Sequence, residues 1–112
     1  MKVAYVFSTN LSHRILNTMI VPQMEEGRHG ADVVGMFFFV DNCYMLTKGN
    51  SVGERLKKLM EQEKIKLLMA CDQCAYEREI DKSLISGAKI GCFPDLYAAI
   101  GSVGGVDQVI TL

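Results

Sequence analysis

The cysteine pair Cys71-x-x-Cys74 has the residue types and the spacing that point most directly to chemistry. A cysteine thiolate is a nucleophile, and a second thiol three residues away can attack an oxidised or persulfidated partner. The same spacing also occurs in thioredoxin-type redox sites and in zinc sites. The pair therefore predicts thiol chemistry, with Cys71 and Cys74 as the catalytic candidates among the chain's four cysteines.

The elements that must position this pair alternate along the chain between apolar runs of strand length and amphipathic stretches of helix length. Expected strands cover residues 3–7, 31–40, 65–70, 88–93 and 108–112. Strict alternation favours an α/β fold in which a parallel sheet has helices on both faces.

Local signals mark the expected helices. The first begins after Asn10, should be kinked or shortened by Pro22, and should end at Gly27 or Gly30. The second has capping-box spacing, with Ser51 as its N-cap and Glu54 three residues on. A short helix should follow residue 71, and Pro94 suits the first turn of a helix over residues 95–100.

The expected topology brings all four cysteines to one edge of the sheet. Cys43 follows the second strand, Cys71 and Cys74 follow the third, and Cys92 lies near the end of the fourth. Ligands of parallel α/β sheets bind at the carboxyl ends of the strands. Because Cys71 lies where a strand leads into a helix, we expect the helix N-terminus to lower the pKa of its thiol.

Several further residues near this edge are candidates for binding a substrate. His13 could bind an anion or transfer a proton, Lys48 could pair with an anionic sulfur substrate, and Arg78 could hold a thiolate or anchor its loop. The full set of substrate-binding candidates is Asn10, His13, Cys43, Lys48, Arg78 and Cys92.

Composition narrows the class of protein. A chain of 112 residues and 12.4 kDa has the size of one domain, residues 1–112. Its net charge of -1 argues against a broad nucleic-acid-binding surface. Neither a signal-peptide pattern nor an apolar run of ~20 residues is present, so we expect a cytoplasmic protein that does not enter a membrane. No Walker or dinucleotide-binding motif occurs, and we expect no cofactor and assign no metal ligand.

Segments spread over nearly the whole chain carry a family likeness. They are Lys2–Phe7, Cys43–Gly49, the stretch Cys71-x-x-Cys74-x-x-x-Arg78-x-Ile80, Leu96–Ile100 and Asp107–Leu112. In order and spacing they resemble the DsrE/DsrF-like sulfur-relay family in its YchN-type form. This resemblance implies a three-layer α/β/α fold with a five-stranded parallel sheet, and assembly as a trimer or hexamer. It also implies a persulfide on Cys71. The family usually has Gly where Glu79 stands, so we expect the loop after Cys71 to differ.

These observations favour a sulfur carrier or sulfurtransferase-like protein. Cys71 would accept sulfane sulfur from a donor protein and pass it to the thiol of an acceptor protein, or Cys74 would release it by forming a disulfide. Three alternatives stay open at this point. They are a metal-binding module that uses the four thiols, a thioredoxin-like dithiol redox protein, and an oligomeric scaffold without turnover.

Overall fold

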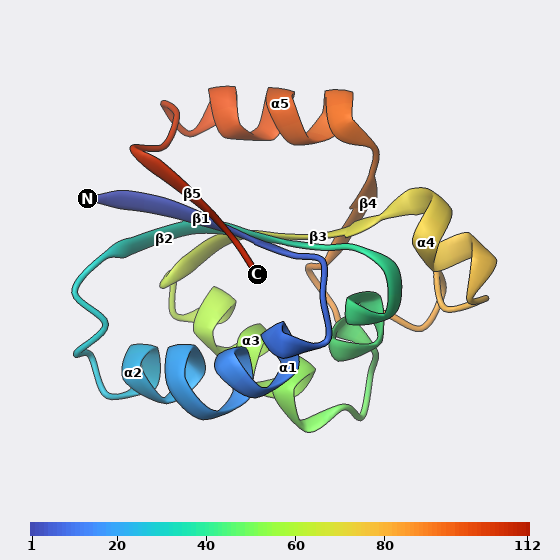
Figure 1. The fold of residues 1–112 in the computed structure, drawn as a ribbon, viewed down its shortest axis with the longest axis horizontal. Coiled ribbons are helices and arrows are strands. Elements are labelled where there is room, and N and C mark those ends of the chain that lie inside the picture. Colours follow the sequence, from blue (N-terminus) through green and yellow to red (C-terminus); the bar gives the residue numbers. More distant parts are fainter.

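The computed structural model describes all residues 1–112 and shows a five-stranded parallel sheet with helices on both faces (Figure 1). The strands are β1 (Lys2–Phe7), β2 (Asp32–Phe38), β3 (Ile65–Cys71), β4 (Lys89–Gly91) and β5 (Gln108–Thr111). The helices are α1 (Leu11–Ile15), η1 (Leu16–Ile20), α2 (Val21–Glu25), η2 (Val40–Leu46), α3 (Ser51–Glu61), α4 (Asp72–Glu77) and α5 (Phe93–Ser102). The expected α/β/α architecture is confirmed.

The strand order is β4-β3-β2-β1-β5, and each neighbouring pair is parallel. The chain steps from β1 to β4 in one direction and then returns to the far side of β1. Because parallel crossovers are right-handed, this reversal places α5 on one face and α1 to α3 on the other (Figure 1). The carboxyl ends of all five strands therefore meet at one edge, where β3 and β4 are neighbours.

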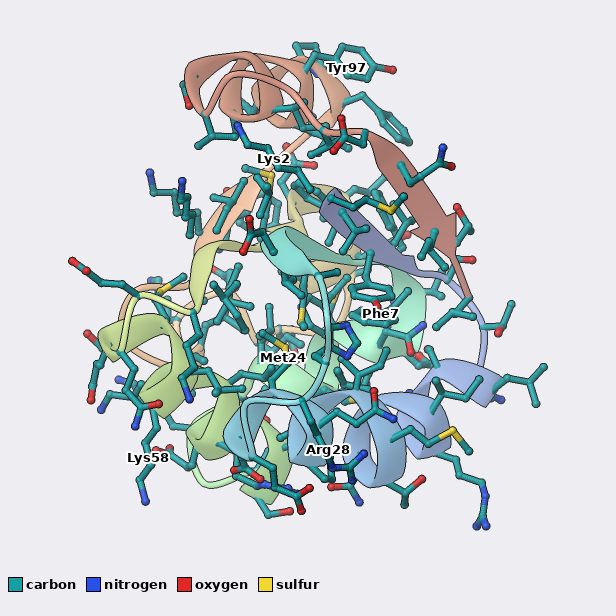
Figure 2. The ribbon with its side chains drawn as sticks, turned by 90° about the vertical axis from the view of Figure 1, so that its left-hand side faces the viewer. Lys2, Phe7, Met24, Arg28, Lys58 and Tyr97 are labelled. Carbon is teal, nitrogen blue, oxygen red and sulfur yellow. The ribbon has the colours of Figure 1, made fainter.

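The two layers of the core differ in size. A cluster of 24 buried residues, including Phe7 and Met24, lies on the side of α1 to α4, and Figure 2 shows both side chains between the sheet and the helices. Five buried residues form the layer under α5. Cys74 of α4 belongs to the large cluster and Leu96 of α5 to the small one, so these two helices cover opposite faces.

Two strands are shorter than expected because helices begin earlier. β2 ends at Phe38, since residues 40–46 form the 3-10 helix η2, which buries Cys43 and Leu46. β4 ends at Gly91, since Cys92 already caps α5. Pro94 lies in the first turn of α5, as expected.

The first helix runs through Pro22 and is not stopped by it. A π-helical turn, η1, comes directly before Val21, and the chain then resumes as α2 with Pro22 in its first turn. Proline has no N–H for the i→i−4 bond, and widening the preceding turn accommodates this without ending the helix. α2 ends at Glu25, and Gly27, the residue after its C-cap, has a φ of 71°, which is the left-handed conformation that glycine favours.

The N-cap of α3 is Asn50, one residue before the expected Ser51. The Asn50 Oδ1 accepts the N–H groups of Val52 at 3.0 Å and Gly53 at 3.4 Å. A Cβ at Gly53 would lie 2.6 Å from the Met45 carbonyl oxygen, so this glycine lets α3 pack closely on η2. None of the helices combines the length and the hydrophobicity needed to cross a lipid bilayer.

Candidate thiol site at the end of β3

Cys71 is the last residue of β3 and the N-cap of α4, and Cys74 is the third residue of that helix. The Cys71 Sγ accepts the backbone N–H of Cys74 at 3.5 Å, and the two thiols lie within hydrogen-bonding reach of each other. Cys71 is half-buried, whereas Cys74 is only 9% exposed. The helix start therefore pairs one accessible thiol with one covered thiol.

The electrostatics of Cys71 differ from the expectation that the helix start lowers its pKa. Burial raises the pKa of Cys71 above its ordinary value, and the adjoining Cys74 thiol and the Asp72 carboxylate raise it further. The Cys74 N–H acts in the opposite direction but does not prevail. Cys71 consequently holds its proton more firmly than a free cysteine.

The Cys74 sulfur is reached by the segment that follows β2. The Val40 N–H donates to the Cys74 Sγ at 3.2 Å, across a sequence separation of 34 residues. Arg78, the C-cap of the same helix, donates its Nη1 to the Cys74 carbonyl oxygen at 3.2 Å. Its Nε donates to the Asp41 Oδ1 at 2.9 Å and so ties α4 to η2. The expected anchoring role of Arg78 thus has a structural counterpart.

Cys43 lies beside Cys71 and Cys74, but its thiol keeps its proton. It is fully buried, and its Sγ donates to the Phe38 carbonyl oxygen at 3.2 Å. Burial raises the pKa of Cys43 to about 12, and the nearby Cys74 contributes to the rise. At neutral pH, Cys43 is a protonated core residue beside the other two sulfurs.

Cys92 lies at the same edge in the other layer. It is exposed and caps α5, and its Sγ donates to the Asp95 Oδ2 at 3.2 Å. This hydrogen bond raises the pKa of Cys92 and lowers that of Asp95. No group of three or more His, Cys, Asp or Glu side chains is arranged to hold a metal ion, so the four cysteines do not form one ligand cluster.

The other candidates lie on separate segments of the carboxyl edge. Asn10 is exposed at the N-cap of α1, where its side chain makes no capping bond. His13 is half-buried, and its Nε2 is covered without a hydrogen-bond partner. Lys48 is exposed, and its backbone N–H donates to the Ser83 carbonyl oxygen at 2.8 Å. No hydrogen bond joins these three side chains to the thiols.

Glu79 takes the left-handed backbone conformation that glycine favours, with a φ of 55°. The Ile80 N–H donates to the Ala75 carbonyl oxygen at 3.1 Å, as in a helix end closed by a glycine. Residue 79 therefore has the backbone conformation that a glycine would favour, and the expected difference from the family's loop stays a prediction.

Sequence reasoning missed Val40 and Asp41 as neighbours of the site. Both follow β2 directly, so their place at the carboxyl edge was open to prediction. An acidic residue at that edge was a usable signal for the partner of Arg78. A valine carries no such signal, because its contribution is a backbone N–H.

Comparison with solved structures identifies the fold. The chain is similar to the YchN protein of E. coli, with a TM-score of 0.67, 20% sequence identity, and coverage of 99% of this chain and 97% of that one. A protein of unknown function from Methanobacterium thermoautotrophicum matches with a TM-score of 0.67 and 12% identity over 99% and 97% of the two chains. Another from Bacteroides thetaiotaomicron gives 0.65 and 12% over 99% and 94%.

The sequence itself gives no such match. No family model matches the chain, and no curated protein does. The fold is therefore YchN-like over nearly the whole chain, and any activity has to be argued from the side chains.

Proposed function

We propose that residues 1–112 form one DsrE/DsrF-like domain that carries sulfane sulfur as a persulfide on Cys71. One observation carries the proposal. An accessible thiol and a covered thiol lie within hydrogen-bonding reach of each other where β3 runs into α4. The YchN-like fold and the resemblance of the Cys71-x-x-Cys74 segment to the sulfur-relay motif support it.

Loading is a sulfur transfer without net oxidation. The Cys71 thiolate attacks the outer sulfur of a persulfide on a donor protein, a Cys71 S–S bond forms, and the donor's S–S bond breaks. The donor cysteine leaves as a thiolate and takes up the proton that Cys71 lost. Because the pKa of Cys71 is raised, this step should accelerate as the pH rises.

Two routes unload the sulfur. An acceptor protein's thiol can attack the outer sulfur, which returns Cys71 to the thiol. Alternatively, Cys74 attacks the Cys71 Sγ, which forms a disulfide and releases hydrosulfide. The second route oxidises the two thiols by two electrons while the sulfane sulfur is reduced, and an external dithiol must then reduce the disulfide.

The partners follow from this chemistry. They are proteins that present a persulfide or a thiol, and a reducing compartment such as the cytoplasm keeps the pair available. We also propose a homo-oligomer, a trimer or hexamer as the resemblance implies. It is supported by two exposed apolar residues on the edge strand β5, Val109 and Ile110, which are 52% and 39% exposed. Light scattering coupled to gel filtration measures that state.

Intact-mass spectrometry after anaerobic incubation with a low-molecular-weight persulfide tests the function. Wild-type protein should gain the mass of one sulfur atom, and Cys71→Ser should not. Cys92→Ser is the matched control, because that thiol also begins a helix at the same sheet edge, and it should load like the wild type. An adduct that persists undiminished in Cys71→Ser would refute the assignment.

A dithiol oxidoreductase is the second candidate, since the same two thiols could cycle with a disulfide. An insulin-reduction assay separates the two functions. Turnover there without sulfur loading would favour the oxidoreductase.

A further inference from the structure

Val40 has an unfavourable backbone conformation that its side chain does not explain. Its φ is 49°, which is a genuine outlier for a β-branched residue. The side chain is 44% exposed, so the core does not require a valine there. Strained residues of this kind persist only where the surroundings hold them, and they are common at functional sites. Val40 is hydrogen-bonded to the thiol site through its N–H, which donates to the Cys74 Sγ at 3.2 Å.

The turn that aims this N–H is fixed at both ends. The Phe39 N–H donates to the Phe7 carbonyl oxygen at 2.9 Å, which anchors the chain to β1 just before Val40. The Phe39 carbonyl oxygen then accepts both the backbone N–H and the side-chain Nδ2 of Asn42, each at 3.1 Å.

A buried hydrogen bond with Ser12 holds the Asn42 side chain. The Ser12 Oγ lies 2.6 Å from the Asn42 Oδ1, and both residues are fully buried. They are the only polar residues in the buried set. Burying polar groups is costly unless they are hydrogen-bonded. The buried Ser12–Asn42 pair therefore indicates that the conformation of the turn around Val40 is specifically maintained.

The groups around the Cys74 sulfur include two thiols that keep their protons and one guanidinium. Cys71 lies within hydrogen-bonding reach and retains its proton, because burial and the adjoining Cys74 raise its pKa. The Arg78 Nη1 donates to the Cys74 carbonyl oxygen at 3.2 Å, which keeps this guanidinium beside the residue. Cys43 stays protonated, so it adds no competing charge at neutral pH. The carboxylates of Asp41 and Asp72 are the opposing groups, and Arg78 pairs with the first of them.

We propose that Val40 is a positioning residue whose N–H stabilises a thiolate on Cys74, which makes Cys74 the thiol that resolves the persulfide on Cys71. The Cys74 thiolate attacks the Cys71 Sγ, a Cys71–Cys74 disulfide forms, and the bond to the outer sulfur breaks. Hydrosulfide leaves with the electron pair, so the outer sulfur is reduced and the two cysteines are oxidised. The role in release rests on the proposed persulfide chemistry, whereas the role in ionisation does not.

An amide-to-ester replacement at Val40 tests the N–H alone. Semisynthesis with the corresponding α-hydroxy acid keeps the side chain and removes only the donor. The pH dependence of iodoacetamide alkylation, resolved by site through peptide mass spectrometry, then reports each thiol separately. The alkylation midpoint of Cys74 should move to higher pH by about one unit, because a charge-assisted hydrogen bond is lost. Hydrosulfide release near neutral pH should slow by about tenfold, with persulfide loading of Cys71 unchanged.

Two substitutions make the test independent of the ester. Val40→Gly keeps the N–H and suits the backbone, so the Cys74 midpoint should stay where it is in the wild type. Asn42→Ala frees the turn with the N–H present and should move that midpoint in the same direction as the ester, by less. An unchanged midpoint in the ester, or in Asn42→Ala if the ester does not fold, overturns the proposal. So does a wild-type midpoint for Cys71 below that for Cys74. Failure of wild-type loading instead refutes the proposed function, and the titration still decides the role of Val40.

Discussion

Two neighbouring strands, β3 and β4, each lead into a helix whose N-cap is a cysteine. Cys71 pairs in the sheet with Gly91, the residue before Cys92, so the two helix starts lie side by side. They differ in the third helical residue, which is a thiol in α4, Cys74, and a carboxylate in α5, Asp95. The Asp95 carboxylate accepts a hydrogen bond from the Cys92 thiol and raises its pKa, whereas Cys74 gives Cys71 a second thiol within hydrogen-bonding reach.

The comparison shows that exposure alone does not describe how the two helix starts differ. Cys92 is the exposed thiol and Cys71 is half-buried, yet only Cys71 has a second sulfur beside it. Both helices begin at a cysteine N-cap, but α4 also receives contacts from the segment after β2. The Val40 N–H and the Asp41 carboxylate reach Cys74 and Arg78, respectively. The two helix starts therefore differ in one side chain of each helix and in the contacts that α4 receives from that neighbouring turn.

Exchanging the third helical residues should have the largest effect. Cys74→Asp gives α4 the arrangement of α5, so hydrosulfide release should be abolished while the persulfide accumulates on Cys71, because no second thiol can attack it. Its loading should also be slower, since an added carboxylate raises the pKa of Cys71 further. Release is measured as free sulfide, and loading by intact mass.

The reciprocal change, Asp95→Cys, is the control. It gives Cys92 a second thiol at the same spacing, and peptide mapping shows whether a disulfide forms there under mild oxidation. Sulfide release by Cys74→Asp at the wild-type rate would show that the covered thiol has no role in unloading.

The next effect concerns Cys43, the third thiol beside α4, which has no counterpart beside α5. Its pKa is about 12 in the folded protein and its ordinary value is 9.0, so the folded state binds the proton more tightly. The stability linked to this group is complete below pH 9 and is lost as the pH rises from about 9 towards 12. The loss approaches about 1 kcal/mol for each pH unit in that window.

Urea denaturation at several pH values measures this dependence. Cys43→Ser keeps a donor for the Phe38 carbonyl oxygen but does not titrate, so its stability should fall less steeply than that of the wild type above pH 9. Parallel curves for the two proteins would show that the Cys43 thiol is not responsible.

The fold could be predicted from the sequence because the central strands are apolar runs. Most of the residues in 3–7, 33–38 and 67–70 are buried within the parallel sheet, and alternation with helices determines the direction of each strand. From this order alone, Cys71 could be assigned to a carboxyl end beside a short helix. Where two good capping residues adjoin, as Asn50 and Ser51 do, composition does not choose between them.

The energetics of the site were less accessible, because they depend on contacts between distant segments. The position of Cys71 at a helix start suggested a lowered pKa, but burial and the neighbours Cys74 and Asp72 outweigh the single N–H. The burial of Cys43 depends on η2, a 3-10 helix without a clear hydrophobic period. The direction of the Val40 N–H follows from a left-handed backbone conformation, which a valine in the sequence does not predict.

The smallest expected effect compares the far ends of the same two helices. α4 is followed by Glu79 with a φ of 55°, and α5 by Gly104 with a φ of 84°. A residue with a Cβ is disfavoured in this conformation by about 1–2 kcal/mol, and part of this is offset by the greater freedom of glycine in the unfolded chain. Glu79 is exposed, and its side chain makes no hydrogen bond or ion pair. Glu79→Gly should therefore stabilise the protein by about 1 kcal/mol, and Gly104→Ala should destabilise it by a similar amount.

Urea denaturation measures both changes, with Glu63→Gly after α3 as a matched control at a φ of 61°. If Glu79→Gly destabilises the protein while Glu63→Gly stabilises it, the Glu79 side chain contributes an interaction at the end of α4. The ends of α4 and α5 would then differ in side-chain contacts as well as in backbone strain.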